Sequence, residues 1–180
     1  MSEISAFELI AEIRDKAISL ADQSISYSIQ SAGVKNIAYV VNGFNFFCDA
    51  EDVREVSTSQ NIMQVPQTKR WLRGLFNSKG VLYSVTDLSL FAGFDRAIQE
   101  SRGHLLLLAD VDKQSALLVN RVIGFRYFEA ANKVDNIDDD QALPDGLSPF
   151  VSEAFHVDEE YWYRLDISRL IESEQFREVQ

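Results

Sequence analysis

Side chains that could take part in catalysis are few, and most of them are carboxylates. Glu153, Asp158 and Glu159 surround one short acidic stretch. Paired carboxylates held roughly 5 to 10 Å apart on facing walls can transfer protons during glycoside hydrolysis, but carboxylates gathered around one turn are expected to face water. His104 and His156 are the only histidines, so a multi-histidine metal site cannot be built. We expect both to be ordinary residues near strand ends.

Known catalytic and cofactor motifs are absent from the sequence. It has no Gly-x-Ser-x-Gly elbow, no Gly-x-x-x-x-Gly-Lys phosphate loop, no dinucleotide-binding Gly-x-Gly-x-x-Gly and no His-Glu-x-x-His. The acidic run from Asp135 has the spacing of a calcium loop, but Asp140 and Gly146 occupy the positions that need Gly and Glu. We therefore expect a solvated acidic loop, no catalytic residues, no cofactor and no metal. A carboxylate enzyme remains an alternative, and it predicts a deep cleft around Glu153.

Composition indicates a globular chain that avoids polyanions. The chain has 180 residues, 46% of them hydrophobic, which is enough to bury a sizeable core. Its formal charge of −11 repels nucleic acid and anionic lipid headgroups, so we expect neither partner. Cys48 is the single cysteine and is expected to be a small buried hydrophobe in a reducing compartment. No signal peptide or membrane-spanning run is evident, which predicts a cytoplasmic protein without direct membrane insertion.

The first 34 residues are predicted to form a helix and a linker. Apolar residues follow the spacing of one helix face between Ser5 and about Asp22. Ser5 and Glu8 have the relation of a capping box, which satisfies amide donors at a helix start. This amphipathic helix could pack on the domain or dock a partner, and the sequence does not separate the two. The residues of the apolar face are Ala6, Ile10, Ile13, Ala17 and Leu20.

Four predicted β-hairpins dominate the rest of the chain. Residues 71–88 read as two apolar strands around the turn Asn77–Gly80, followed by Asp-Leu, and residues 150–170 repeat this plan. The hairpin over 36–47, with an Asn42-Gly43 turn, similarly corresponds to the one over 103–119. A Val-led stretch follows each of these upstream hairpins. The recurrence predicts a domain over 35–175 that consists of two related halves, approximately 35–94 and 103–171.

Charges near the hairpin over 71–88 suggest a recognition surface. Strict alternation from Val53 places Val53 and Glu55 on one face of a strand. If that strand neighbours the hairpin over 71–88 in the sheet, Glu55 can pair with Lys79 in the turn of that hairpin. Two unrelated solvated charges are the plainer interpretation. Apolar residues near a charged rim are typical of a protein interface. Those nearby are Leu72, Leu75, Val65 and Pro66.

These residues resemble the CheW-like adaptor domains of bacterial chemosensory arrays. The likeness covers Asn36 to about Ile171, and within the family it is greatest to the PilI-type adaptors of type IV pilus systems, which similarly begin with a helix and end like residues 147–171. The hairpin over 71–88 matches the family hallmark at Leu72, Arg73, Gly74, Leu75, Asn77, Lys79, Gly80, Val85, Asp87 and Leu88. Upstream matches are Val53, Glu55, Val56 and Val65-Pro66.

The resemblance implies a mainly β fold and an adaptor function. The expected fold is two small five-stranded SH3-like β-barrels side by side, with the amphipathic helix at the N-terminus. The implied function is non-catalytic coupling of the cytoplasmic tip of a methyl-accepting chemoreceptor to the regulatory domain of a CheA-type histidine kinase. The implied output is twitching motility driven by type IV pili. The localisation would be cytoplasmic, with recruitment to membrane-bound receptor arrays.

The resemblance also implies which residues contact partners. Val53, Glu55, Gly74 and Lys79 match family positions that contact the receptor or shape the surface facing it. Lys79 stands where the family usually has Arg, and a lysine cannot form a bidentate fork with a carboxylate. This chain differs from the family at two further positions: it has Ser84 where the family has Pro, and Phe76 where the family usually has Val.

Two alternatives to the pilus adaptor remain. One is a divergent CheW-like adaptor for another kinase pathway, because the departures could change partner choice. The other is a small-ligand-binding β-barrel, which needs an open interior lined with polar groups. Large strand residues suggest filled barrels instead; they are Phe44, Phe46, Leu106, Leu108, Trp162 and Leu165.

Overall fold

The computed structural model describes residues 34–58, 61–110, 112–134 and 143–178. These residues belong to one compact unit, Val34–Gln180. The helix predicted between Ser5 and Asp22 and the acidic run that starts at Asp135 lie outside the described residues.

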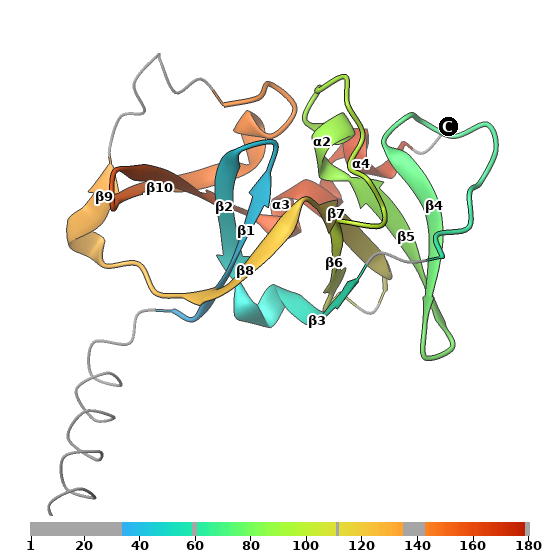
Figure 1. The fold of residues 1–180 in the computed structure, drawn as a ribbon, viewed down its shortest axis with the longest axis horizontal. Coiled ribbons are helices and arrows are strands. Elements are labelled where there is room, and N and C mark those ends of the chain that lie inside the picture. The colour runs from blue at the N-terminus through green and yellow to red at the C-terminus, as the bar shows by residue number, and fades with distance from the viewer. Residues whose placement is uncertain (1–33, 59–60, 111, 135–142, 179–180) are drawn as a thin grey trace, which may run out of the picture. The chain divides into compact units, whose positions relative to one another are not determined.

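The described chain is mainly β, as predicted, and forms two curled sheets (Figure 1). The six-stranded sheet has the order β8-β1-β2-β11-β10-β9 and the five-stranded sheet the order β3-β6-β7-β5-β4. Neighbouring strands are antiparallel except in the pairs β11–β2 and β5–β7. The first sheet exceeds the predicted five strands because two-residue β9 adds to its edge. The strands are β1 Asn36–Val41, β2 Phe44–Asp49, β3 Val53–Thr58, β4 Leu72–Ser78, β5 Val81–Asp87, β6 His104–Leu108, β7 Ser115–Val119, β8 Arg121–Arg126, β9 Lys133–Val134, β10 Val151–Val157 and β11 Glu160–Leu165.

Short helices follow or connect the strands. Asp87 caps α2 and Asp166 caps α3, so the Asp that ends each of two hairpins starts a helix. The helices are α2 Leu88–Phe91, α3 Ile167–Glu172 and α4 Glu174–Arg177, with 3-10 turns η1 Ala50–Asp52, η2 Ala130–Asn132 and η4 Ser148–Phe150.

All four predicted hairpins are present, with turns of the expected chemistry. Asn42 and Gly43 both have positive φ, 48° and 88°, which is the requirement of a type I′ turn between β1 and β2. The β4–β5 turn comprises only Lys79 and Gly80, because Asn77 and Ser78 remain paired in the strands. The Asn77 side chain accepts a hydrogen bond from the Gly80 amide at 2.9 Å, which fixes this tight turn.

The internal repeat is visible in the topology, but one repeat does not make one sheet. Exchanging β1, β2, β3, β4 and β5 for β6, β7, β8, β10 and β11 converts one sheet order into the other, apart from β9. Each sheet therefore contains the upstream hairpin of one repeat together with the remaining strands of the other repeat. The predicted halves 35–94 and 103–171 consequently do not coincide with the sheets. Similar apolar hairpins can pair locally or exchange, and alternation along the sequence does not distinguish these outcomes.

Three apolar clusters fill the described fold. One lies within each sheet's curl and the largest joins both sheets to the helices. Strand β6 shows the division, because Leu105 and Leu107 enter the five-stranded sheet's own cluster while Leu106 and Leu108 enter the shared one. This period of two explains a strand that is apolar on both faces. Cys48 is buried in the shared cluster, as predicted.

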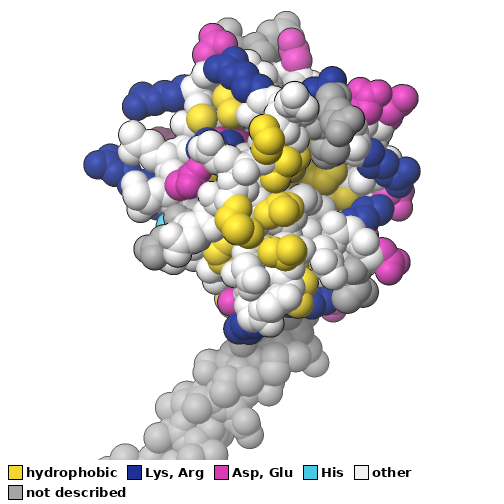
Figure 2. Space-filling model, turned by 90° about the vertical axis from the view of Figure 1, so that its right-hand side faces the viewer, with side chains coloured by type: hydrophobic (Ala, Val, Ile, Leu, Met, Phe, Trp, Pro, Cys, Tyr) yellow, Lys and Arg dark blue, Asp and Glu magenta, His cyan; other side chains and the backbone are white. Residues whose placement is uncertain are grey.

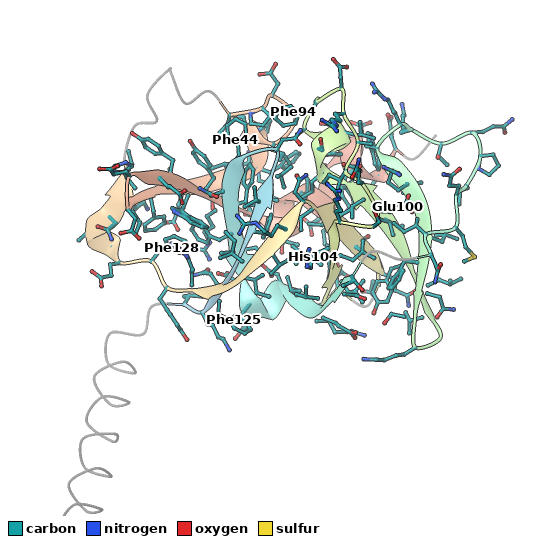
Figure 3. The ribbon with its side chains drawn as sticks, in the orientation of Figure 1. Phe44, Phe94, Glu100, His104, Phe125 and Phe128 are labelled. Atoms are coloured by element: carbon teal, nitrogen blue, oxygen red, sulfur yellow. The ribbon has the colours of Figure 1, made fainter. Side chains whose placement is uncertain are left out.

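The sheet interiors are filled, although mostly not by the residues predicted to fill them. Of those six residues, only Trp162 lies in an interior cluster; the other five belong to or pack against the shared cluster. In the six-stranded sheet, Phe128 contacts Phe47, Phe155 and Trp162 (Figure 3). Apolar packing of this kind gives no support to the small-ligand-binding barrel.

Candidate functional site

The predicted charge pair is formed across the opening of the five-stranded sheet. Lys79 Nζ lies 2.8 Å from Glu55 Oε2. Glu55 is on β3 and Lys79 follows β4, and these are the two edge strands of the sheet rather than neighbours within it. The contact therefore results from the curl of the sheet, which brings its edges together. The hydrogen bond to Glu55, and then its charge, raise the pKa of Lys79. The Lys79 side chain is 80% exposed, so its charge is available to a partner.

Gly74 shapes the backbone near the base of the β4–β5 hairpin instead of presenting a side chain. It is buried and has a φ of +136°. A Cβ atom at this position would lie 2.0 Å from the carbonyl oxygen of Met63. Met63 and Leu75 exchange two backbone hydrogen bonds of 2.8 Å, which holds the segment before β4 against the strand. Only glycine permits this approach.

Val53 faces the core, and the prediction that it shares a face with Glu55 is wrong. Val53 is opposite Leu108 and Glu55 is opposite Leu107, so Arg54 is an extra residue that forms a β-bulge. Directly opposite residues share a face, and adjacent residues of β6 point to opposite faces. Val53 accordingly lies in the shared cluster at 9% exposure. Of the four predicted contact residues, the structure brings Glu55 and Lys79 into direct contact and gives Val53 and Gly74 supporting positions.

A buried carboxylate holds the base of the β4–β5 hairpin. Asp87 is fully buried and accepts hydrogen bonds from the Ser89, Leu90 and Ile98 amides. Arg73 Nη1 lies 3.1 Å from its Oδ2. Burial raises the pKa of Asp87, against the lowering effect of the amides and the guanidinium. The hairpin that carries Lys79 is therefore anchored at the end opposite its tip.

Exposed apolar side chains cover the outer face of this hairpin. Met63 is opposite Leu75, and the register of β4 and β5 places Leu75 and Leu82 on the face away from the interior residue Tyr83. Met63 is 53% exposed and Leu82 is 45% exposed. Figure 2, which views the side of the molecule where β4 and β5 lie, shows hydrophobic side chains gathered in the middle of that face with charged groups around them. We name Met63, Leu75 and Leu82 the hairpin face.

The predicted apolar residues account for only part of this surface. Val65 and Pro66 are exposed, as an interface requires, while Leu72 and Leu75 are half-buried. Sequence reasoning missed Met63 and Leu82. Alternation in β5 could have identified Leu82, because Tyr83 and Val85 point inward and their neighbours must point outward.

A second apolar stripe runs along edge strand β8. Ile123, Phe125 and Tyr127 alternate with half-buried residues and are exposed by 37%, 59% and 57%. Figure 3 shows Phe125 at the rim of the molecule. Lys35 Nζ lies 3.7 Å above the Phe125 ring, and the Lys35 carbonyl accepts a hydrogen bond from Ala50 at the start of η1, which leads into β3. The stripe therefore lies close to the strand that carries Glu55.

The two departures from the family pattern within the hairpin have structural consequences. The Ser84 amide donates to the Gln114 carbonyl at 2.9 Å, a bond that proline could not make. The Ser84 hydroxyl also lies 3.4 Å from that of Ser115 on β7. Phe76 packs against the interior cluster of the five-stranded sheet. Both residues join the hairpin to its sheet.

Glu153 adjoins a groove but is not placed for proton transfer. The groove, about 450 Å³ in volume, lies between β10–β11 and the segments around η1 and α3. The two oxygens of Glu153 bond separately to Lys133 at 2.6 Å and Arg164 at 3.0 Å, and these bonds lower the pKa of Glu153. Asp158 and Glu159 are at the hairpin tip with positive φ and do not line this groove. The predicted carboxylates are therefore not assembled into an acid–base pair.

The two histidines add no catalytic feature, and the described residues form no metal site. His104 begins β6, as expected of a residue near a strand end, and the exposed ring of His156 lies 4.7 Å from that of Tyr161. Among the residues that the structure covers, no three His, Cys, Asp or Glu side chains are placed to hold a metal ion. No helix in that part of the chain is long and apolar enough to cross a membrane.

Comparison with known proteins places the chain in a family. The model of the CheW-like domain matches residues 37–175. The chain belongs to the CheW-like domain family, as its residues suggested. It is similar to Protein PilI of Pseudomonas aeruginosa, with 25% identity over 157 residues that cover 87% of this chain and 86% of PilI. The fold is similar to that of the scaffolding protein TtCheW from Thermoanaerobacter tengcongensis, with a TM-score of 0.66, 17% identity and coverage of 82% of this chain and 94% of TtCheW.

Proposed function

We propose that the protein is a non-catalytic cytoplasmic adaptor in a chemosensory pathway. It would join the cytoplasmic tip of a methyl-accepting chemoreceptor to the regulatory domain of a CheA-type histidine kinase. Likeness to PilI over most of both chains supports a pathway that controls twitching motility through type IV pili. Membership of the CheW-like family supports the adaptor function itself.

One observation carries the proposal at the level of residues. An exposed Glu55–Lys79 pair lies at the tip of a hairpin whose outer face is apolar. A desolvated apolar centre with a charged rim is the usual composition of a protein interface. In this arrangement Glu55 and Lys79 contact the partner, while Val53 and Gly74 hold β3 and β4 in place.

Mechanical coupling follows from how the sheets are joined. The largest apolar cluster contains residues of both sheets and of the short helices, so the described fold moves as a packed body. Partners bound at the hairpin face and at the β8 stripe would therefore be held in a defined relative position. A rigid body between receptor and kinase can transmit displacement without chemistry of its own.

Charge reversal at Lys79 tests this proposal. The full chain should co-purify with the cognate kinase's regulatory domain and with a receptor cytoplasmic fragment. Lys79→Glu should weaken association with at least one of these partners and leave thermal unfolding nearly unchanged, because an exposed charge contributes little to stability. Arg169→Glu, which reverses an exposed charge on α3 away from the hairpin tip, is the matched control and should bind as the natural chain does.

The outcomes separate the alternatives. Undiminished binding by Lys79→Glu to both partners would show that the hairpin tip is not a contact surface. If the natural chain binds a kinase domain from a different pathway and not the pilus-type one, the divergent adaptor is correct. Absence of binding to any receptor or kinase fragment would overturn the adaptor function.

A further inference from the structure

The short C-terminal helix fixes one aromatic side chain against the body of the domain. Ser173 caps the start of α4: its hydroxyl accepts a hydrogen bond from the Phe176 amide at 3.2 Å and donates one to the Leu170 carbonyl at 2.7 Å. This cap connects α4 to the end of α3. Phe176 is only 7% exposed. The family model ends at residue 175, so the match stops one position before this side chain.

Phe176 lies against both ends of the β4–β5 hairpin base. Its ring stacks on Trp71 with centroids 6.1 Å apart and meets Phe91 nearly edge-on at 5.8 Å. Trp71 directly precedes β4, and Phe91 ends α2, the helix that follows β5. The Trp71 and Phe91 rings also contact each other at 5.5 Å. Figure 1 shows α4 close to α2 and the top of the hairpin.

Polar contacts close the same base. The Trp71 carbonyl accepts a hydrogen bond from the Asp87 amide at 2.8 Å, which joins the start of β4 to the end of β5. Lys69 Nζ and Glu178 Oε2 lie 3.9 Å apart, so the segment after α4 also contacts the chain that enters β4. Thus the C-terminal segment contacts the hairpin where it begins and ends.

Small movements at this base are amplified at the tip. Strands of seven residues extend about 23 Å at ~3.3 Å per residue, so a tilt of about 10° displaces the tip by about 4 Å. A displacement of this size would break the contact between Lys79 and Glu55 and would reorient the hairpin face. Orientation of the partner surface therefore depends on packing at the opposite end of the hairpin.

We propose that Phe176 is a positioning residue for the partner surface. Through Trp71 and Phe91 it sets the orientation of the β4–β5 hairpin, and so the placement of Lys79 and Leu82 relative to Glu55. Changes in the C-terminal segment would then tune partner affinity without touching the contact residues. The effect on affinity rests on the proposed adaptor function, whereas the effect on the hairpin does not.

Amide hydrogen exchange of the free, full-length protein tests the positioning directly. Phe176→Ala should increase exchange at hairpin amides between Phe76 and Tyr83 by about tenfold, because loss of the ring lowers the free energy of local opening. The control is Phe155→Ala, which removes a ring of equal 7% exposure from the six-stranded sheet's interior. It should increase exchange in β10–β11 and not in β4–β5. Hairpin amides as protected in Phe176→Ala as in the natural chain would overturn the proposal.

Binding to the kinase regulatory domain provides the second measurement, made at a temperature where all variants are folded. Phe176→Ala should raise the Kd about tenfold, Phe155→Ala by less than about threefold, and Phe176→Leu should recover most of the loss because it keeps apolar contact with Trp71. If both alanine variants weaken binding equally, Phe176 affects binding only through the overall stability of the fold. If the natural chain itself does not bind, the adaptor function is wrong, and the exchange data still decide whether Phe176 orients the hairpin. Phe176→Leu gives the same exchange readout at smaller amplitude if Phe176→Ala does not fold.

Discussion

The two hairpin-and-helix units, β4–β5–α2 and β10–β11–α3, follow one plan but hold their charges differently. Each has a bulge near the start of its first strand, a two-residue turn with positive φ and an Asp that caps the following helix. In the first unit Asp87 is buried against Arg73 and three amides. In the second, half-buried Asp166 accepts the Arg169 amide, while Arg164 bonds to Asp49 and Glu153 on neighbouring strands.

Different residues therefore set the topology and the surface chemistry of these units. Apolar alternation and turn geometry recur in both units and produce the same strand pairing. Charges are not constrained by that packing, and so the first tip carries Lys79 where the second carries Asp158. The unit with the buried anchor at its base is also the one that presents a cation beside an apolar face.

Removing the cap carboxylate should give the largest difference between the units. Asp87→Ala leaves the Arg73 guanidinium and three amides without this acceptor, and loss of one partner from a buried charge pair costs about 3–5 kcal/mol. Asp166→Ala removes an ordinary helix cap worth about 1 kcal/mol. Urea unfolding of both variants measures the free energies. Similar losses for the two variants would mean that burial of Asp87 adds nothing to the cap.

Adding a methyl group at Gly74 should be the next most damaging change. The second unit has Glu153 at the equivalent position, so a side chain there is compatible with the plan itself. Gly74→Ala combines a positive φ with a clash against Met63, and should lose about 2–4 kcal/mol of unfolding free energy.

Gly124→Ala is the control that measures the backbone strain of a positive φ without the clash. Gly124 has a similar φ of +130°, but a Cβ atom there meets no atom within 4 Å, so only the strain of about 1–2 kcal/mol remains. Equal losses at the two glycines would show that the segment at Met63 moves away freely. Gly74 would then not be what allows the Met63 segment to lie against β4.

Local features of this fold could be predicted from the sequence, whereas features that depend on distant pairing could not. Alternation and Asn-Gly turn chemistry located the four hairpins, but the short helices that Asp87 and Asp166 cap were not predicted. Exchange of the upstream hairpins between sheets was not predictable, because both are apolar on two faces and either pairing buries them. The bulge at Arg54 reversed the expected relation of Val53 and Glu55, since one extra residue shifts every following side chain to the other face.

The residues of the candidate site were likewise only partly predictable from the sequence. Opposite charges suggested a Glu55–Lys79 pair on the condition that their elements were neighbours in the sheet, but the pair instead joins the two edges of one sheet. Met63 lies in a segment without regular alternation, so its exposure beside β4 had no periodic signal. Phe176 is a single apolar residue in a four-residue helix, which is too short to show periodicity.

A smaller effect should distinguish the second unit by its pH dependence. Bonds to Lys133 and Arg164 lower the pKa of Glu153 in the folded state, so within the window just below its ordinary pKa the unfolded state binds more protons. Stability from Glu153 is therefore fully present above the unfolded pKa and is lost as pH falls through the folded pKa. Glu153→Gln should be less stable than the natural chain by about 1 kcal/mol at pH 7, and the difference should shrink toward acid pH. Urea unfolding at several pH values measures it, and a difference that stays constant with pH would show that the charge of Glu153 is not its source.

Exchanging the two tip residues should have the smallest effect on stability. Lys79→Asp gives the first tip the residue of the second, and Asp158→Lys makes the reciprocal change. Lys79→Asp loses the bond to Glu55 and places like charges together, but Asp tolerates the left-handed conformation found at both positions better than Lys does. These opposing terms should leave the urea midpoint unchanged within error, and Asp158→Lys should lower it slightly because it has only the conformational loss. A clear fall for Lys79→Asp would mean that the Glu55–Lys79 pair holds the two edges of the five-stranded sheet together, and any weakening of partner binding by changes at Lys79 would then report a distorted sheet and not a lost contact.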